Sequence, residues 1–522
     1  MSSEQEAPRF VIGVPKETIA GERRVAATPA TVVALRKLGL EVLVQSGAGE
    51  LSSIQDAAYA EAGAQVVQDV AQVWAADLVI KVRAPTSLAE GGHEVELLRD
   101  GGRLLSFVWP AQNAELLGRL TAKKATVLAM DMVPRISRAQ KLDALSAMAN
   151  IAGYRAVIEA THQLGRFLGA QMTAAGKVKP AQVLVIGAGV AGLSAAATAR
   201  SLGAQVSAFD TRPAVREQVE SLGGKFIPFE PPESGEGDGG YAKEVSEAYL
   251  AAEQALIAQH CATADIVITT ALVPGMRAPI LIPSGAVVGM RRGSVIVDLA
   301  AEQGGNCALT ERDRTVERFG VWVFGHTDLT SRMGPVASEL YATTVLRVIE
   351  EIYVDKRLTI DREDEIHRSM LVVDAGTVTW PPPKFAPRAA APAPVPAAAP
   401  IAHVPPPASN VGNVVMGAAA LTVLGLSSFG TPELRQHITT FVLACIVGWH
   451  VIWNVTPALH TPLMSVTNAI SGIILVGGML AVVGGGLGPA TWLGVAAVLV
   501  ASINVAGGFL VTQRMLRMFR RA

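Results

Sequence analysis

Residues 183–210 have the types and spacing that bind a dinucleotide. An apolar strand is followed by a glycine-rich turn, an alanine-rich helix and a second strand that ends on a carboxylate. Gly187 permits the tight turn, Gly189 lets the backbone approach a pyrophosphate, and Gly192 lets the helix pack closely on the sheet. Backbone N–H groups at the start of the helix, around Val190, would meet the phosphates.

The carboxylate at the end of the second strand predicts which nucleotide is bound. Asp210 follows Gly187 by 23 residues, where it can accept a hydrogen bond from a ribose 2′-hydroxyl. Because its charge would repel a 2′-phosphate, the pattern favours NAD(H) over NADP(H). Arg212 weakens this preference, since a guanidinium two residues away could attract that phosphate. The alternative to a nucleotide site is an ordinary buried βαβ unit.

The dinucleotide motif is predicted to lie in the second of two Rossmann-like α/β domains. Short apolar runs alternate with helical stretches, which is typical of a parallel, doubly wound sheet. Two helical segments, 137–168 and 331–352, would carry the chain into the nucleotide domain and back. We therefore expect a discontinuous first domain, 1–136 with 331–380, and an NAD(H)-binding domain at 137–330. The expected strands are 9–14, 41–45, 65–67, 78–81, 104–108, 126–129, 225–228, 266–269, 294–298 and 321–324.

The composition of the chain excludes several classes of protein. Its 522 residues carry a net charge of −1, so nothing points to nucleic acid as a partner. Cys261, Cys307 and Cys445 are far apart and form no CxxC pair, which fits a reducing compartment and predicts no metal site. An acidic, glycine-rich loop, ESGEGDGGYAKE, holds Tyr241 and is either a mobile lid or a surface excursion.

The last part of the chain has the composition of a tethered membrane region. Residues 381–410 contain 11 prolines and 10 alanines and would form a semi-rigid linker. Residues 411–522 are almost without charge until their last turn, which predicts four transmembrane helices, with three as the alternative. Their expected ranges are about 414–429, 438–455, 467–484 and 491–511.

Basic residues predict the orientation of these spans. Lys384 and Arg388 precede the first span, and the chain ends in RMLRMFRRA, so both ends of the membrane region should lie on the cytoplasmic side. The first ten residues resemble no export signal, and we expect the first domain to be cytoplasmic too. Polar residues in or beside the spans could form interhelical hydrogen bonds or line a proton path. They are His450, Asn454, Asn468 and Asn504.

Several runs resemble the superfamily of alanine dehydrogenases and proton-translocating transhydrogenases. They are GVPKETIAGERRVAATP near the N-terminus, KVRAPT at Lys81, PRISRAQKLDALSAMANIAGYRAVIEA from Pro134, and VIGAGVAGL. The linker, the expected spans and HTPLMSVTNAISGI from His460 resemble the alpha subunits of membrane nicotinamide nucleotide transhydrogenases. The resemblance implies a multi-pass protein of the bacterial inner membrane that transfers hydride from NADH to NADP+, with Re/Si specificity, while protons move inward. NADP(H) would be held by a beta subunit, in an alpha2-beta2 assembly containing a homodimer of the soluble domains.

The resemblance also implies the residues that hold the nicotinamide end of NAD(H). An amide and a hydroxyl there can hold the carboxamide and fix which ring face is presented. Leu272 would line the ring pocket, Tyr241 would close over the nucleotide, and Asp210 would bind the adenosine ribose. The resemblance assigns the nicotinamide end to Arg135, Ile136, Gln140, Asp143 and Ser146. All of these except Ile136 would contribute to catalysis by positioning the nicotinamide ring. The alternative for this segment is a helix start capped by Ser137.

One position separates a transhydrogenase from a membrane-tethered alanine dehydrogenase. An amino-acid dehydrogenase must move a proton as well as a hydride, so it needs an acid/base group beside the reacting carbon. In alanine dehydrogenases a histidine follows a strand similar to LLSFVWPAQN, whereas Trp109 stands here. We therefore interpret Lys81 and Arg24, which would hold a substrate carboxylate in that relative, as structural residues. A third function, a nucleotide sensor, is disfavoured because the nicotinamide-end residues are retained.

The sequence contains one dinucleotide fingerprint. A second glycine cluster, at residues 484–488, lacks a preceding strand and a distant acid. Because hydride transfer requires the two nicotinamide rings to be nearly in contact, the NADP(H) site must lie on another chain.

Overall fold

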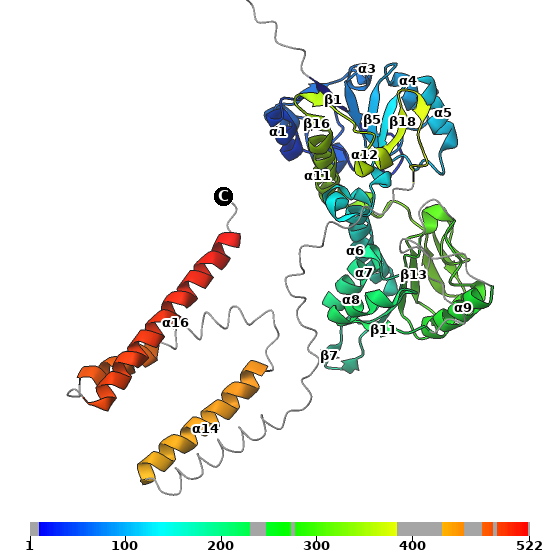
Figure 1. Ribbon diagram of the computed structural model, residues 1–522. Helices are drawn as coiled ribbons and strands as arrows, with labels where there is room; N and C mark the ends of the chain where they lie inside the picture. Colours follow the sequence, from blue (N-terminus) through cyan, green and yellow to red (C-terminus); the bar gives the residue numbers. More distant parts are fainter. Residues whose placement is uncertain are drawn as a thin grey trace, which may run out of the picture. The chain divides into compact units, whose positions relative to one another are not determined.

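Figure 1 presents the chain as a computed structural model. It describes residues 10–229, 247–272, 277–383, 431–453, 472–483 and 488–519. The chain divides into two units, residues 1–388 and 389–522, each of which is described by itself. The expected loop with Tyr241, the linker from residue 384 and the expected span 414–429 lie outside the described residues.

The first domain is built on an eight-stranded sheet in the order β19-β18-β6-β5-β4-β1-β2-β3. The six strands β1 to β6 are parallel, as the alternating pattern predicts. β18 and β19 return from late in the sequence and pair antiparallel at one edge, which the sequence did not predict. The strands are β1 (Val11–Val14), β2 (Glu41–Gln45), β3 (Gln65–Val67), β4 (Leu78–Ile80), β5 (Arg103–Ser106), β6 (Thr126–Ala129), β18 (Leu371–Asp374) and β19 (Thr377–Val378).

Helices pack against both faces of this sheet, where buried side chains form two apolar clusters. They are α1 (Pro29–Lys37), α2 (Asp56–Glu61), α3 (Val70–Trp74), α4 (Glu94–Leu97), α5 (Ala114–Ala122) and α12 (Glu365–Met370).

The second domain contains a seven-stranded sheet in the order β11-β10-β9-β12-β13-β15-β14. From β9 the chain builds outward in one direction through β10 and β11, and then returns to build in the other direction from β12. The carboxyl ends of β9 and β12 are therefore the topological switch point, where ligands bind to open α/β sheets. The strands are β9 (Gln182–Ile186), β10 (Gln205–Phe209), β11 (Lys225–Ile227), β12 (Ile266–Thr269), β13 (Val295–Asp298), β14 (Thr315–Arg318) and β15 (Val321–Phe324).

Helices α7 to α10 and one short hairpin complete the described part of the second domain. The hairpin, which the sequence did not predict, is formed by β7 (Gln171–Thr173) and β8 (Gly176–Val178). The helices are α7 (Val190–Ser201), α8 (Arg216–Ser221), α9 (Glu247–Cys261) and α10 (Ser284–Val288). The predicted fold class, two parallel-sheet α/β domains, is thus confirmed for the described part of residues 10–383. In the two large sheets the antiparallel strands lie toward the edges.

Two long helices, α6 (Ala144–Leu164) and α11 (Gly334–Ile352), connect the domains. Met148 and Ile151 of α6 lie in the core of the first domain, whereas Ala156 and Ala160 lie in the core of the second. The predicted helix at 137–168 begins later than expected, because residues 137–142 form a 3-10 turn, η3. One helix is therefore embedded in both cores, which fixes its two ends relative to the two sheets.

The expected membrane region, residues 411–522, contains α14 (Pro432–Trp453), a helix at 472–483 and α16 (Pro489–Phe519). Across the parts of this region that the structure describes, no helix is both long and apolar enough to cross a membrane. Asn454 and Asn468 lie outside the described residues.

Candidate functional site

The glycine-rich turn has the geometry that a dinucleotide requires. Gly187 has a φ of 92°, which favours glycine, and a Cβ there would lie 2.6 Å from the hydroxyl of Thr270. A Cβ at Gly192 would lie 1.8 Å from the carbonyl oxygen of Gly187, so α7 could not start so close to the turn. A Cβ at Gly189, in contrast, would meet only the tip of Arg212, at 4.0 Å. The space in front of the turn is therefore open, and the residues fit a pyrophosphate.

The start of α7 faces this open space. Gly189 is the N-cap residue and Val190 begins the helix with 44% of its surface exposed. The first N–H groups of a helix have no partner within it and carry a partial positive charge. These N–H groups can donate hydrogen bonds to phosphate oxygens.

At the adenosine end, Asp210 is already hydrogen-bonded within the chain. Its carboxylate accepts the backbone N–H groups of Ala188, at 2.7 Å, and Arg212, at 2.9 Å. It also accepts two hydrogen bonds from the Arg212 guanidinium, both at 2.9 Å. These hydrogen bonds raise the pKa of Arg212. The sequence left open whether Arg212 would attract a phosphate; the structure pairs it with Asp210, and the pair is electrically neutral.

The predicted nicotinamide-end residues surround the start of α6. The Asp143 carboxylate caps this helix by accepting the backbone N–H of Ser146, at 2.8 Å, and its hydroxyl, at 2.6 Å. Arg135 and Gln140 are exposed, and Ile136 is half-buried. The cap is therefore Asp143 and not Ser137, and it fixes the Ser146 hydroxyl in place.

Neighbouring cations fasten this segment to the first domain. Lys141 lies 3.0 Å from Glu351, at the end of α11, and Arg138 is hydrogen-bonded to Asp364, before α12. Both cations hold the side of η3 that faces the first domain, while the Gln140 side chain has no partner among the described residues. The loop is thus anchored while its amide remains available to a ligand.

Helix α6 joins the two ends of the site because it crosses α7 at close range. A Cβ at Gly153 would lie 2.0 Å from the carbonyl oxygen of Ala191, and the Ser194 hydroxyl donates to the carbonyl of Asn150, at 2.7 Å. Ser146 lies seven residues before Gly153 on α6, which is about 10 Å along a helix. The crossing therefore sets the spacing between the predicted nicotinamide-end residues and the helix start that is predicted to bind the phosphates.

Leu272 lies just beyond β12 with 39% of its surface exposed. Sequence reasoning missed the two residues that hold its loop. Thr270 donates its hydroxyl to the carbonyl of Gly187, at 2.8 Å, and the buried Asn306 exchanges hydrogen bonds with Ala271, at 3.1 and 2.8 Å. The position of Thr270 at the carboxyl end of a strand beside β9 was a signal that could have identified it.

In the first domain, Lys81 and Arg24 are neutralised by buried carboxylates. The Lys81 ammonium lies 2.8 Å from Glu94 and 3.4 Å from Glu17. Arg24 donates two hydrogen bonds to Glu22, at 2.7 and 2.6 Å. Burial alone would lower the pKa of Lys81, but the charges of Glu17 and Glu94 raise it. Neither cation is available to a substrate carboxylate.

Trp109, which follows β5 in the chain, occupies an unusual backbone conformation. Its φ of 52° is rare for a bulky side chain, and its ring stacks on Phe107 with centroids 5.9 Å apart. Asp131 accepts the N–H groups of Val108 and Trp109, at 2.6 and 3.0 Å, and its burial raises its pKa to about 6. The indole carries no group that could exchange a proton with a keto acid.

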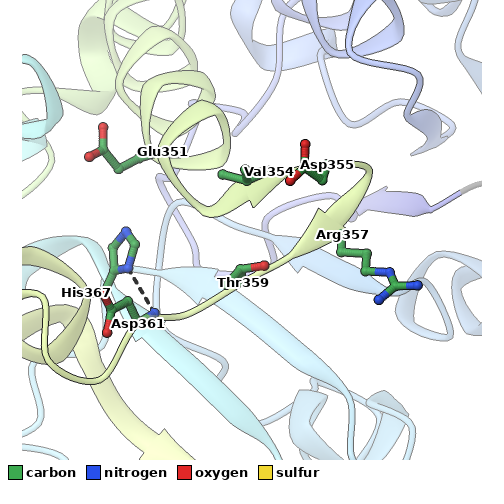
Figure 2. A pocket seen from close by; sticks show the side chains of 7 residues that line it. All are labelled: Glu351, Val354, Asp355, Arg357, Thr359, Asp361 and His367. Carbon is green, nitrogen blue, oxygen red and sulfur yellow. Dashed lines mark hydrogen bonds between the residues drawn. The ribbon is translucent and has the colours of Figure 1, made fainter.

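A cavity of about 540 Å³ lies beyond the end of α11, and none of the predicted site residues lines it (Figure 2). His367 lines it and accepts the N–H of Asp361 at Nδ1, at 3.1 Å. Carboxylates of Glu351, Asp355 and Asp361 also line it and would repel a pyrophosphate. This cavity is not the nucleotide site.

Comparisons with known proteins cover both domains and the C-terminal region. Residues 13–152 and 156–381 match the families described as "Alanine dehydrogenase/PNT", N-terminal and C-terminal domains. Residues 437–521 match the "4TM region of pyridine nucleotide transhydrogenase".

Individual relatives differ in how much of the chain they match. The NAD(P) transhydrogenase subunit alpha of Haemophilus influenzae is 48% identical over 521 residues, covering 98% of this chain and all of the relative. The crystal structure of a transhydrogenase from Sinorhizobium meliloti is 41% identical with a TM-score of 0.64, covering 70% of this chain and 99% of that one. An alanine dehydrogenase of Mycobacterium tuberculosis is 38% identical but covers 56% of this chain and 73% of its own.

Proposed function

The chain belongs to the alanine dehydrogenase and pyridine nucleotide transhydrogenase family, and on that premise we propose that it is the NAD(H)-binding alpha subunit of a proton-translocating transhydrogenase. The reaction is direct hydride transfer from NADH to NADP+ held on a beta subunit, coupled to inward movement of protons. The match of residues 437–521 to a transhydrogenase membrane region supports this function over that of a tethered alanine dehydrogenase.

The observation that carries the proposal is the pairing of Lys81 and Arg24. In a dehydrogenase of this family these cations would hold a keto acid, but here Glu94, Glu17 and Glu22 neutralise them. A substrate carboxylate would add an uncompensated charge to a buried site, at a cost of several kcal/mol. Trp109 stands at the position where the family's alanine dehydrogenases carry a histidine, so this position supplies no acid/base group, and the paired cations offer no site for a substrate carboxylate.

Bound NADH supplies the hydride, and the residues of this chain bind and orient it. The start of α7 receives the pyrophosphate, and Asp210 accepts a hydrogen bond from the adenosine ribose. Gln140 and Ser146 hold the carboxamide, and thereby give the transfer its Re/Si specificity. The nicotinamide end is lined by Arg135, Ile136 and Leu272. Tyr241 closes over it. None of these side chains forms a covalent intermediate.

In the proposed assembly two alpha and two beta subunits lie in a bacterial inner membrane. The NAD(H) domain and both termini are on the cytoplasmic side. A homodimer of the soluble domains has an apolar surface available near the β7–β8 hairpin, where Phe167 and Met172 are 54% and 71% exposed.

The choice of hydride acceptor tests this function. The full chain is co-expressed with a beta subunit and supplied with NADH and either thio-NADP+, whose reduced form has its own absorbance, or pyruvate with ammonium. We expect transfer to thio-NADP+ alone, and loss of that transfer when the beta subunit is omitted. Oxidation of NADH by pyruvate and ammonium would instead identify a tethered alanine dehydrogenase.

A further inference from the structure

The inner face of α9 lies against the strand end that carries Asp210. Tyr249, on the first turn of α9, is 4% exposed and packs edge-on against Phe229, with ring centroids 5.3 Å apart. Phe229 packs in turn against Phe209, at 5.8 Å, and Phe209 is the residue before Asp210. Glu253 follows Tyr249 by one helical turn, so it projects from the same face of α9.

Glu253 is a buried acid, and no cation pairs with it in the part of the chain that the structure describes. Glu253 is 6% exposed, and its carboxyl group has neither a hydrogen bond nor an ion pair among the described residues. Burial and, to a smaller extent, the charge of Asp210 together raise its pKa to about 7. The ring contacts from Tyr249 through Phe229 to Phe209 link the face of α9 that carries Glu253 to the residue before Asp210, and the two carboxylates repel each other.

This second acid matters because Asp210 cannot reject a phosphate by charge alone. The Arg212 guanidinium is bound to Asp210 through two hydrogen bonds, which makes the pair neutral and even leaves an arginine beside the ribose position. An arginine at this place is what NADP(H)-binding sites use to accommodate the 2′-phosphate. The ionised form of Glu253 supplies the negative charge that the pair lacks.

We propose that Glu253 is the specificity-determining residue that makes the adenosine end of this site reject a ribose 2′-phosphate. This inference rests on the proposed NAD(H) site, and it assigns selectivity to a residue outside the dinucleotide fingerprint. It also explains how a site with Arg212 next to its ribose-binding acid can remain selective for NAD(H), as a transhydrogenase with separate NAD(H) and NADP(H) sites requires.

The proposal predicts that selectivity depends on the charge of Glu253. Among the described residues, the titratable groups whose charges interact with Glu253 are Asp210, just beyond β10, and Tyr249, on α9. Above pH 7, ionised Glu253 should weaken NADPH binding relative to NADH by about tenfold or more, since repulsion between close charges at a partly buried site is of that order. Below pH 7 its protonation should reduce the discrimination.

The test compares NADH and NADPH binding by fluorescence titration of the purified full-length chain in detergent, at pH 8 and pH 6. Glu253→Gln and Glu253→Met both remove the charge at similar side-chain length. Glu247→Gln, at an exposed position on the first turn of the same helix, is the matched control. Titration of the 2′-phosphate itself is common to all variants and cancels in the comparison.

At pH 8 we expect both Glu253 variants to improve NADPH affinity relative to NADH by about tenfold or more, and the control to leave the ratio at its wild-type value. At pH 6 the variants should approach the wild-type ratio. An unchanged ratio at pH 8 in a variant that still binds NADH would overturn the inference and leave the NAD(H) site standing. Failure of the wild-type chain to bind NADH would overturn the proposed function as well.

Discussion

Replacement of Gly153 by alanine tests how the chain spaces the two ends of its nucleotide site. A Cβ at this position would lie 2.0 Å from the carbonyl oxygen of Ala191 and 2.9 Å from its carbonyl carbon. Both obstructing atoms belong to the backbone, so no rotamer change can relieve the clash. To restore a contact of 3.0 Å, α6 and α7 must separate by about 1 Å. We expect the free energy of unfolding to fall by about 1 to 3 kcal/mol, the usual cost of overpacking.

The larger effect of Gly153→Ala should fall on hydride transfer. The substitution moves the start of α6, with Gln140 and Ser146 near it, relative to the phosphate-binding start of α7. A displacement of about 1 Å in the groups that position a reactant can lower its rate about 100-fold. NADH affinity should fall much less, because the contacts around Gly189 remain. The assays are thio-NADP+ reduction with a beta subunit, NADH titration and thermal unfolding.

Gly118→Ala is the matched control for this substitution. Gly118 lies inside α5, and a Cβ there would meet nothing within 4 Å. Alanine should therefore stabilise the helix by about 0.5 to 1 kcal/mol and leave transfer unchanged. If Gly153→Ala matched this control in both thermal stability and transfer rate, the role that we give to the α6–α7 crossing would be refuted.

Three further perturbations test separate parts of the account. Gln140→Ala should slow hydride transfer at least about tenfold while weakening NADH binding far less. Transfer assays and NADH titrations measure the two effects. Equal losses in both would show that Gln140 only binds NADH and does not position it for transfer. Lys81→Met should lower the free energy of unfolding by about 3 to 5 kcal/mol, since it leaves Glu94 and Glu17 buried without their cation; a loss below about 1 kcal/mol in denaturant titrations would contradict the buried-pair account. The pKa of Glu253 is raised from 4.5 to about 7 in the folded chain. Between these two pH values the folded chain keeps a proton on Glu253 that the unfolded chain loses. The free energy of unfolding should therefore fall by roughly 3 kcal/mol as the pH rises from about 4.5 to 7. Unfolding measured across this range should lose that slope in Glu253→Gln, and an identical slope in both proteins would show that Glu253 is not the group responsible.

The sequence predicted the features that local rules determine. Strands β1 to β6 and β9 to β13 follow from apolar runs alternating with helical stretches, and the turn around Gly187 follows from glycine spacing. The α6 segment was predicted to connect the domains because its apolar residues recur at helical spacing. Its role as a spacer, however, depends on the contact of Gly153 with Ala191, and a contact between distant backbones leaves no pattern in either segment.

Other features could not be predicted because they depend on side-chain direction or distant partners. Arg212 could have faced solvent, a phosphate or Asp210, and two residues of separation allow all three. The carboxylate nearest to Lys81 is that of Glu94, but its second partner, Glu17, comes from much earlier in the chain. Glu253 gave no signal, because a single acid on a helix is normally solvent-exposed. The antiparallel strand β18 pairs with β6 from a distant part of the chain, and no local pattern indicates that pairing.

The most direct test of the central claim is to follow the hydride itself. NADH deuterated at the transferring C4 position is mixed with NADP+ and the full chain assembled with a beta subunit, and the label is measured in NADPH and in water by mass spectrometry. Direct transfer between nucleotides predicts that all of the transferred deuterium appears in NADPH. Deuterium in the solvent, or in alanine when pyruvate and ammonium are present, would contradict the assignment of this chain as a transhydrogenase alpha subunit.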